Sequence, residues 1–223
     1  VGLNGVGTKA VNALSSDFTA ESFRDGLCKK AIFKQGVLAE EIDAKTDQEN
    51  GTLIEFVADQ EIFKNFRFIS EFVENQIWNY VYLNAGLNVY FNDKRFYSKN
   101  GLLDLLMRKT DAEKHRYNPI HLKGDDIEVA ITHDSHYGED YYAFVNGQHT
   151  TQGGTHLLAF KESVVKTIRE FYGKNFDLSD IRASIIGAIS IRVQEPVFES
   201  QTKTKLGSTD MGPKGPSIKA FIS

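Results

Sequence analysis

The sequence has little of several features that would point to particular classes of protein. It holds one cysteine, Cys28, in 223 residues, which excludes an internal disulfide and fits a reducing compartment such as the cytoplasm. No apolar run approaches the ~20 residues that a membrane-spanning helix needs, so we expect no membrane partner. No charged-then-apolar leader is visible at the beginning, and we therefore expect no secretory signal.

A strong excess of basic residues is also missing. Lys and Arg number 26 and Asp and Glu number 30, which gives a net charge of −4 and a pI near 5.9. This balance argues against binding nucleic acid over the whole surface, although it leaves room for a local basic patch. The hydrophobic fraction of 41%, with 16 Phe and 9 Tyr, suffices for the cores of one large domain or two small ones.

Hydrophobic periodicity predicts helices and strands that are mixed along the chain. Apolar residues at helical spacing predict long helices over residues 68–83 and 155–172. Shorter helices are expected at residues 8–15, at 100–110, and from a cap at Ser179-Asp180 to Ile186. Strands are expected within residues 18–33, 51–57 (half-buried), 87–91 and 188–193, with a strand end and an exposed loop at 39–50.

The order of these elements indicates the fold class. Residues 127–133 and 141–146 both alternate, and we expect them to pair as a hairpin through residues 134–139. Because helices and strands do not follow a regular βαβα rhythm, the sequence favours an α+β fold over a doubly wound sheet. The best domain boundary lies near residues 96–101 and divides the chain into 1–97 and 98–223.

The glycine-rich beginning, Val1-Gly2-Leu3-Asn4-Gly5-Val6-Gly7-Thr8-Lys9, is suited to wrapping backbone amides around phosphate. A P-loop needs G-x-x-x-x-G-K-[ST], but here Thr8 and Lys9 stand in the reverse order. A dinucleotide fingerprint accepts Gly5-x-Gly7-x-x-Ala10, but no following βαβ unit is evident. A tight helix-entry turn that binds nothing is the third interpretation. Because nothing precedes these glycines, we expect the chain to be a piece of a longer protein.

Further polar motifs lie in the second half of the chain. The run Glu199-Ser200-Gln201-Thr202-Lys203-Thr204-Lys205 could bring a lysine and a glutamine to the same phosphate, or could be a solvated loop. In Gly153-Gly154-Thr155-His156 we favour a structural role, with the glycines turning the chain and Thr155 capping a helix, over a catalytic histidine. His133, Asp134 and His136 lack a convincing set of further metal ligands.

Together these motifs resemble the B subunits of bacterial type II DNA topoisomerases, a family in the gyrase, Hsp90, histidine kinase and MutL ATPase superfamily. The resemblance covers essentially the whole chain in the right order. It is carried by these segments: Leu3-Asn4-Gly5-Val6-Gly7 with 11–15, Gly51-Thr52 with Phe56 and 61–63, 82–87, 144–146, 153–156, and 196–198 with 201–207. It implies part of a gyrase/Hsp90-type ATPase α/β sandwich (1–97), followed by a transducer domain like ribosomal protein S5 domain 2 (98–223).

The resemblance also implies roles for individual residues. The family's glycine box wraps the ATP phosphates, a role that passes to Leu3, Asn4, Gly5, Val6 and Gly7. Asn4 departs from the histidine usual in bacterial gyrases, so it cannot become cationic. Thr52 matches a position that helps to hold adenine. Lys203, with Gln201 beside it, matches the transducer lysine that contacts the terminal phosphate, and we assign these two to the catalytic site.

At the level of the whole protein, the resemblance implies an ATP-hydrolysing type II topoisomerase with ATP and Mg²⁺ as cofactors. DNA, the topoisomerase A subunit and a second copy of the ATPase region are the implied partners, and the cytoplasm is the implied location. The family's general-base glutamate and magnesium-binding asparagine lie upstream of the glycine box. We therefore expect this chain alone to be inactive and not to bind ATP tightly. Topoisomerase IV is slightly preferred over gyrase. The alternatives are a non-hydrolysing transducer module and a related mismatch-repair or Hsp90-type ATPase.

Overall fold

The computed structural model describes residues 5–223, so the predictions for Leu3 and Asn4 lie outside the described residues. The chain divides into two compact units, one ending at Ile69 and the other spanning Ser70–Ser223. Helices and strands are mixed in sequence, which confirms the α+β class. The division at 69/70 differs from the predicted domain boundary at 97/98, which remains a prediction.

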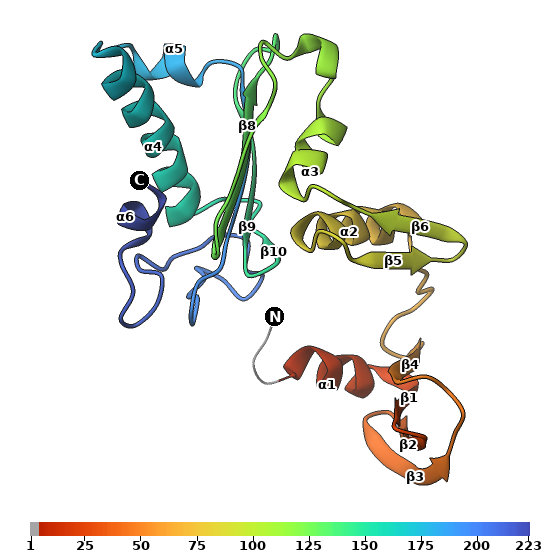
Figure 1. The fold of residues 1–223 in the computed structure, drawn as a ribbon. Coiled ribbons are helices and arrows are strands. Elements are labelled where there is room, and N and C mark those ends of the chain that lie inside the picture. Colours follow the sequence, from red (N-terminus) through yellow and green to blue (C-terminus); the bar gives the residue numbers. More distant parts are fainter. Residues whose placement is uncertain (1–4) are drawn as a thin grey trace. The chain divides into compact units, whose positions relative to one another are not determined.

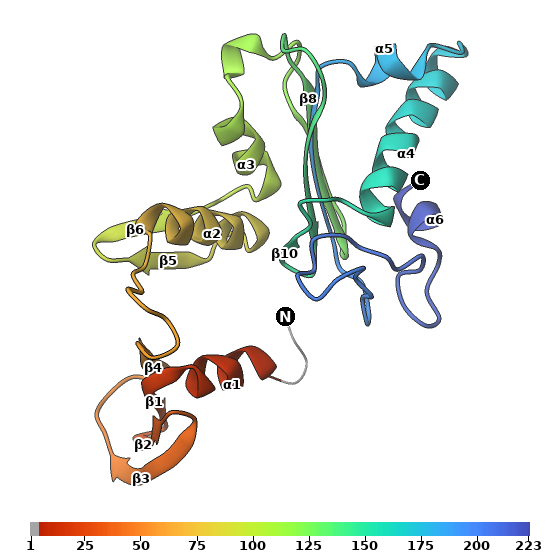
Figure 2. The same cartoon turned by 180° about the vertical axis from the view of Figure 1, so that it is seen from behind.

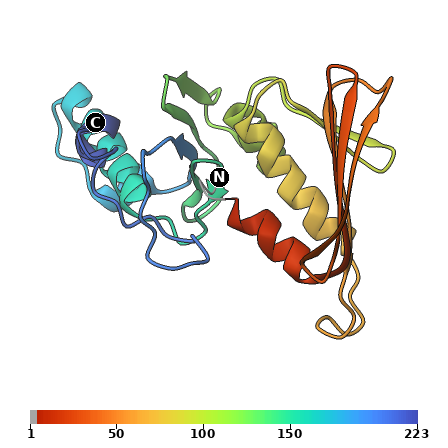
Figure 3. The same ribbon diagram turned by 90° about the horizontal axis from the view of Figure 1, so that it is seen from below.

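The first unit is a helix followed by an antiparallel sheet. Its elements are α1 (Val6–Ala13), β1 (Ser15–Arg24), β2 (Leu27–Lys34), β3 (Val37–Lys45) and β4 (Gly51–Ala58), and the strand order is β3-β2-β1-β4. Figure 3 shows this sheet nearly edge-on, in red to orange. The first hairpin turns at Asp25-Gly26 and the second at Gln35-Gly36, all with positive φ, as two-residue turns that match the twist of the strands require.

The sheet of the first unit is largely uncovered. Residues 51–57 of β4 and all of β3 are exposed, and in β1 only Ser15 and Phe18 are buried. The expected half-buried strand at 51–57 is therefore wrong in its burial, because no second layer of the described unit covers β4. The expected loop at 39–50 is mostly strand, since β3 continues to Lys45.

The second unit is a five-stranded sheet with helices on both faces (Figures 1 and 2). The sheet order is β10-β9-β11-β8-β7, and β5 and β6 form a separate hairpin. The elements are α2 (Ser70–Leu83), β5 (Asn88–Phe91), β6 (Lys94–Tyr97), α3 (Leu102–Lys109), β7 (Ile120–Lys123), β8 (Ile127–His133), β9 (Asp140–Val145), β10 (Gln148–His149), α4 (Thr155–Tyr172), α5 (Leu178–Arg182), β11 (Ile185–Ile191) and α6 (Ile218–Ile222). Among the described residues, no helix is long and apolar enough to cross a bilayer.

Alternation along the strands builds two cores. One face of the sheet, including Ile189 and Ile191 of β11, packs with Phe160 of α4 and with Leu206 and Ile218. The other face contributes Ala130, Phe144, Ile186 and Ala188 to a core with Tyr82 of α2 and three leucines of α3, namely Leu102, Leu105 and Leu106. The long helices at 68–83 and 155–172 are thus confirmed, with α2 beginning two residues later.

The position of strand β11 contradicts two predictions made from the sequence. The expected hairpin between β8 and β9 is wrong, because β11 lies between them and pairs antiparallel with β8 and parallel with β9. The expected short helix exists as α5, but its predicted cap and end are wrong: it begins at Leu178 after the N-cap Asp177 and ends at Arg182, since β11 begins at Ile185. The physical reason is the same in both cases. Six of the seven β11 residues are buried, and an apolar strand of this kind is stable only at the centre of a sheet covered on both faces.

Candidate functional site

The predicted glycine turn lies at the beginning of α1. Gly5 is the N-cap with a φ of 61°, a left-handed conformation that glycine adopts easily, and no side chain caps the helix. Val6, the first helical residue, is 63% exposed. The first amides of a helix have no partner within the helix, and they favour anions. This geometry is compatible with binding phosphate.

Gly7 lies in the first turn of α1, where packing gives no reason for a glycine. A Cβ added at Gly7 would meet no atom of the described residues within 4 Å. Glycine inside a helix costs about 1 kcal/mol relative to alanine. The local fold of the described residues therefore does not require a glycine at this position.

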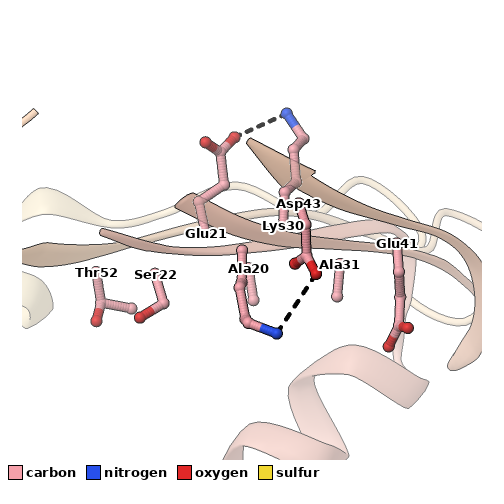
Figure 4. A pocket seen from close by; sticks show the side chains of 9 residues that line it. Ala20, Glu21, Ser22, Lys30, Ala31, Glu41, Asp43 and Thr52 are labelled. Atoms are coloured by element: carbon pink, nitrogen blue, oxygen red, sulfur yellow. Dashed lines mark hydrogen bonds and ion pairs between the residues drawn. The ribbon is translucent and has the colours of Figure 1, made fainter. Parts of the chain in front are cut away.

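Thr52 lies on β4 in a polar row that crosses the first sheet. It pairs with Ser22 of β1, Ser22 pairs with Lys29 of β2, and Lys29 pairs with Asp43 of β3. Lys29 Nζ is 3.5 Å from Asp43 Oδ2. Figure 4 shows Thr52, Ser22 and Asp43 on one face and the Glu21–Lys30 ion pair on the other.

Small side chains next to this row leave space on the same face. Ala20 and Ala31 pair across β1 and β2 and line a shallow pocket together with Thr52 and Ser22. The Thr52 side chain is exposed, and its hydroxyl forms no hydrogen bond with any of the described residues. Charged side chains, among them Lys29 and Asp43, line the same pocket, so its surface is mixed in polarity.

Gln201 and Lys203 lie on a loop of the second unit, here called the switch loop (residues 198–206). Its base closes through an antiparallel bridge between Phe198 and Leu206 and a hydrogen bond from Glu199 N to Lys205 O at 3.1 Å. At its tip, Lys203 N donates to Ser200 O at 3.0 Å. Lys203 has a φ of 56°, a left-handed backbone conformation that is uncommon for residues with a side chain and that occurs more often at functional sites.

The two lysines of the switch loop differ in their partners. Lys205 Nζ lies 2.9 Å from Glu199 Oε1. Lys203 forms no ion pair within residues 5–223. Gln201, two residues before Lys203, is exposed at the same tip. Lys203 is therefore the lysine of this loop whose charge is available to an anion.

The Gly-Gly-Thr-His motif contacts the base of the switch loop, which the sequence did not predict. Gly154 is the N-cap of α4, with φ 129° and ψ −162°. The expected cap by Thr155 is wrong, because Thr155 is the first helical residue and its Oγ1 donates instead to Ser208 O at 2.6 Å. Positive φ at Gly153 and Gly154 confirms that the glycines turn the chain.

His156 is a structural residue. Its side chain is fully buried, and Nε2 lies 3.2 Å from the hydroxyl of Thr150, which itself donates to Ala143 O. Burial lowers the pKa of His156 from 6.5 to about 4. The imidazole is therefore neutral near pH 7 and inaccessible to a substrate, which argues against a catalytic histidine.

The buried His156 predicts a pH-dependent stability. The unfolded chain takes up the proton near pH 6.5 and the folded chain only near pH 4, so stability present above pH 6.5 is lost as the pH falls toward 4. We expect a loss of at most about 3 kcal/mol. Urea denaturation at several pH values should show this slope in the native chain and a flatter profile in His156→Gln. Equal slopes in both would contradict it.

The histidines near residue 134 are engaged within the protein. His133 Nδ1 lies 2.6 Å from Tyr117 Oη, and its Nε2 lies 3.0 Å from Ile181 O. His136 Nδ1 lies 2.9 Å from Asp134 Oδ1. The part of the chain that the structure describes contains no cluster of three metal-binding side chains. His133 therefore holds β8 to Tyr117 and to α5, and His136 is held by Asp134 within the loop between β8 and β9.

The predicted site residues thus fall into two groups. Gly5, Val6, Gly7 and Thr52 belong to the first unit, whereas Gln201 and Lys203 belong to the second.

Comparison with known proteins identifies the family. A family model described as DNA gyrase B matches residues 87–218. The B subunit of DNA topoisomerase 4 from Borreliella burgdorferi is 43% identical over 210 residues, covering 94% of this chain and 35% of the relative. The B subunit of DNA gyrase from Helicobacter pylori is 32% identical over 232 residues, covering 93% of this chain and 30% of the relative. The chain thus spans about a third of the length of these relatives.

Solved structures agree with this assignment. The 43K ATPase domain of Thermus thermophilus gyrase B superposes with a TM-score of 0.77 at 25% identity, covering 98% of this chain and 64% of that one. The ATPase region of Saccharomyces cerevisiae topoisomerase II has the same fold, with a TM-score of 0.74 at 22% identity and coverage of 93% and 56%. Since the family model matches more than half of the chain, the protein belongs to the DNA gyrase B family.

Proposed function

We propose that this chain is the part of a type II DNA topoisomerase B subunit that holds one wall of the ATP site and transmits the state of the nucleotide. The parent protein uses ATP to pass one DNA duplex through another. Residues 1–97 are the C-terminal part of its ATPase domain, and residues 98–223 are its transducer domain. The relatives named as topoisomerase IV and gyrase B subunits support this assignment.

The observation that carries the proposal is the availability of Lys203. It lies at the tip of the switch loop without an ion pair among the described residues, and the solved structures of similar proteins include an ATPase domain of gyrase B. A lysine there stabilises the charge that develops on the transferred phosphoryl group. Lys203 also senses whether the terminal phosphate is present. The uncharged side chain of Gln201 donates a further hydrogen bond to the same phosphate.

The first unit supplies the other contacts. The backbone amides at Gly5, Val6 and Gly7 cradle the phosphates together with Leu3 and Asn4, and Thr52 hydrogen-bonds adenine. Mg²⁺ in such ATPases neutralises phosphate charge. Among the described residues there is no group of three or more metal-binding side chains, and we assign no magnesium ligand to this chain.

The proposal extends to partners. The parent protein acts in the cytoplasm on DNA, with a topoisomerase A subunit and with a second copy of itself joined through the ATPase region. The identity of 43% to a topoisomerase IV subunit, against 32% to a gyrase subunit, supports topoisomerase IV.

The experiment compares this 223-residue chain with the full-length subunit. We expect the full-length subunit to hydrolyse ATP with Mg²⁺ and, with its A subunit, to pass DNA strands in an ATP-dependent reaction. The chain alone should do neither. Full-length protein that folds but neither binds nor hydrolyses ATP would favour the non-hydrolysing transducer module instead.

A further inference from the structure

The turn before α4 and the base of the switch loop are joined by a set of short contacts that we call the clamp (residues 152–155 with 204–208). We propose that Thr155 is a positioning residue, which fixes Lys203 through the clamp and couples the switch loop to α4. This inference rests on the proposed function of Lys203. The clamp joins the two motifs that the resemblance leaves separate.

Backbone hydrogen bonds form most of the clamp. Gln152 N donates to Thr204 O at 2.9 Å, and Leu206 N donates to Gly153 O at 3.0 Å. Thr155 N donates to Leu206 O at 3.2 Å, and Gly154 and Leu206 form a parallel bridge. Each bond joins the turn at residues 152–155 to the last residues of the switch loop. The loop therefore has a fixed base directly after Lys203.

Gly154 explains how the two segments approach so closely. Its φ of 129° and ψ of −162° belong to a region that is essentially restricted to glycine. A Cβ at this position would lie 2.3 Å from Leu206 O and 2.5 Å from Leu206 N. The backbone contact is thus possible only because residue 154 has no side chain, and rare conformations of this kind cluster at functional sites.

Thr155 adds the side-chain bond that ties the clamp to a rigid element. Its Oγ1 donates to Ser208 O at 2.6 Å, and Thr155 is also the first residue of the 18-residue helix α4. Leu206 is buried in the same core as Phe160 of α4. Because the loop base and the helix share both a core and the clamp, a displacement of the switch loop moves the N-terminus of α4 with it.

The test uses the full-length subunit and two probes, a non-hydrolysable ATP analogue and ADP. Thr155→Val removes the hydroxyl and keeps the branched shape, whereas Thr155→Ser keeps the hydroxyl. We expect Thr155→Val to weaken binding of the analogue about fivefold and to leave ADP binding unchanged, and Thr155→Ser to restore the native affinity. Ser163→Ala is the control, since it removes another hydroxyl-to-carbonyl bond of α4, to Ala159 O, outside the clamp.

Two further measurements separate the explanations. In a Lys203→Ala background, Thr155→Val should have no additional effect on binding of the analogue, because the clamp acts through Lys203. Amide hydrogen exchange should become faster at residues 203–206 in Thr155→Val and not in Ser163→Ala. Equal losses for the analogue and ADP, or unchanged analogue binding despite faster exchange, would overturn the clamp. If Lys203→Ala itself leaves analogue binding unchanged, the proposed function of Lys203 fails instead.

Discussion

Replacing Lys203 by alanine in the full-length subunit is expected to lower ATP turnover about 10²–10³-fold. The reason is that a cation aimed at the terminal phosphate stabilises the transition state more than the bound substrate, so that its loss lowers kcat more than it weakens ATP binding. Lys203 is suited to this role because no carboxylate neutralises it within the described residues. Steady-state kinetics with a coupled ATPase assay measures the effect.

Lys205→Ala is the matched control for this prediction. Lys205 lies two residues away on the same loop, but its ammonium is paired with Glu199. We expect turnover within about twofold of native, because an exposed ion pair of this kind contributes about 1 kcal/mol or less. Equal losses in the two variants would mean that the loop acts through its overall charge, and an unchanged Lys203→Ala would remove Lys203 from the site.

Gly154→Ala is expected to destabilise the second unit by about 3 kcal/mol or more, the second large effect. The alanine would have to adopt a glycine-only conformation, which costs about 1–3 kcal/mol. Its Cβ would also overlap the backbone of Leu206, which cannot rotate away as a flexible side chain can. Chemical denaturation followed through Trp78, the single tryptophan and a partner of Phe96, reports on this unit.

Gly147→Ala isolates the part of the effect that comes from backbone strain. Gly147 has a φ of 81°, but a Cβ there would meet no described atom within 4 Å. We expect a loss of about 1 kcal/mol from the left-handed conformation alone. If both variants lose the same stability, the close contact between Gly154 and Leu206 does not exist in solution.

Local patterns of the sequence were enough to predict the two long helices, α2 and α4. The repeat of apolar residues in 155–172 predicted α4 with its observed bounds, because the buried face of a helix requires apolar residues at a regular local spacing. The α+β class and the family followed from the order of elements and from the motifs. The rival interpretation as a mismatch-repair or Hsp90-type ATPase is not supported, since the gyrase B model matches.

Pairing between distant segments could not be predicted in the same way. Strands β8 and β9 are neighbours in sequence and both alternate, yet β11, about 40 residues later in the chain, takes the place between them. The apolar run in β11 indicated burial but not position. For the same reason Thr155 resembled a helix cap, because nothing in the sequence places Ser208 O within reach of its hydroxyl.

The candidate site also combines motifs that could be predicted from the local sequence with contacts that could not. The glycine turn was recognisable from its composition as a candidate phosphate-binding motif, whereas the role expected of Lys203 came from the resemblance to the family. The contact between residues 152–155 and 204–208 depends on the fold of the whole second unit, and only the structure reveals it. The one sequence signal for it was the doubled glycine at 153 and 154, which indicates that the backbone must bend or approach closely.

The central claim is that Lys203 contacts the terminal phosphate of the bound nucleotide. The most direct measurement is a crystal structure of the full-length subunit with a non-hydrolysable ATP analogue. We predict that Lys203 Nζ lies about 3 Å from an oxygen of the terminal phosphate. Lys203 directed into solvent, or a nucleotide bound elsewhere, would contradict the claim.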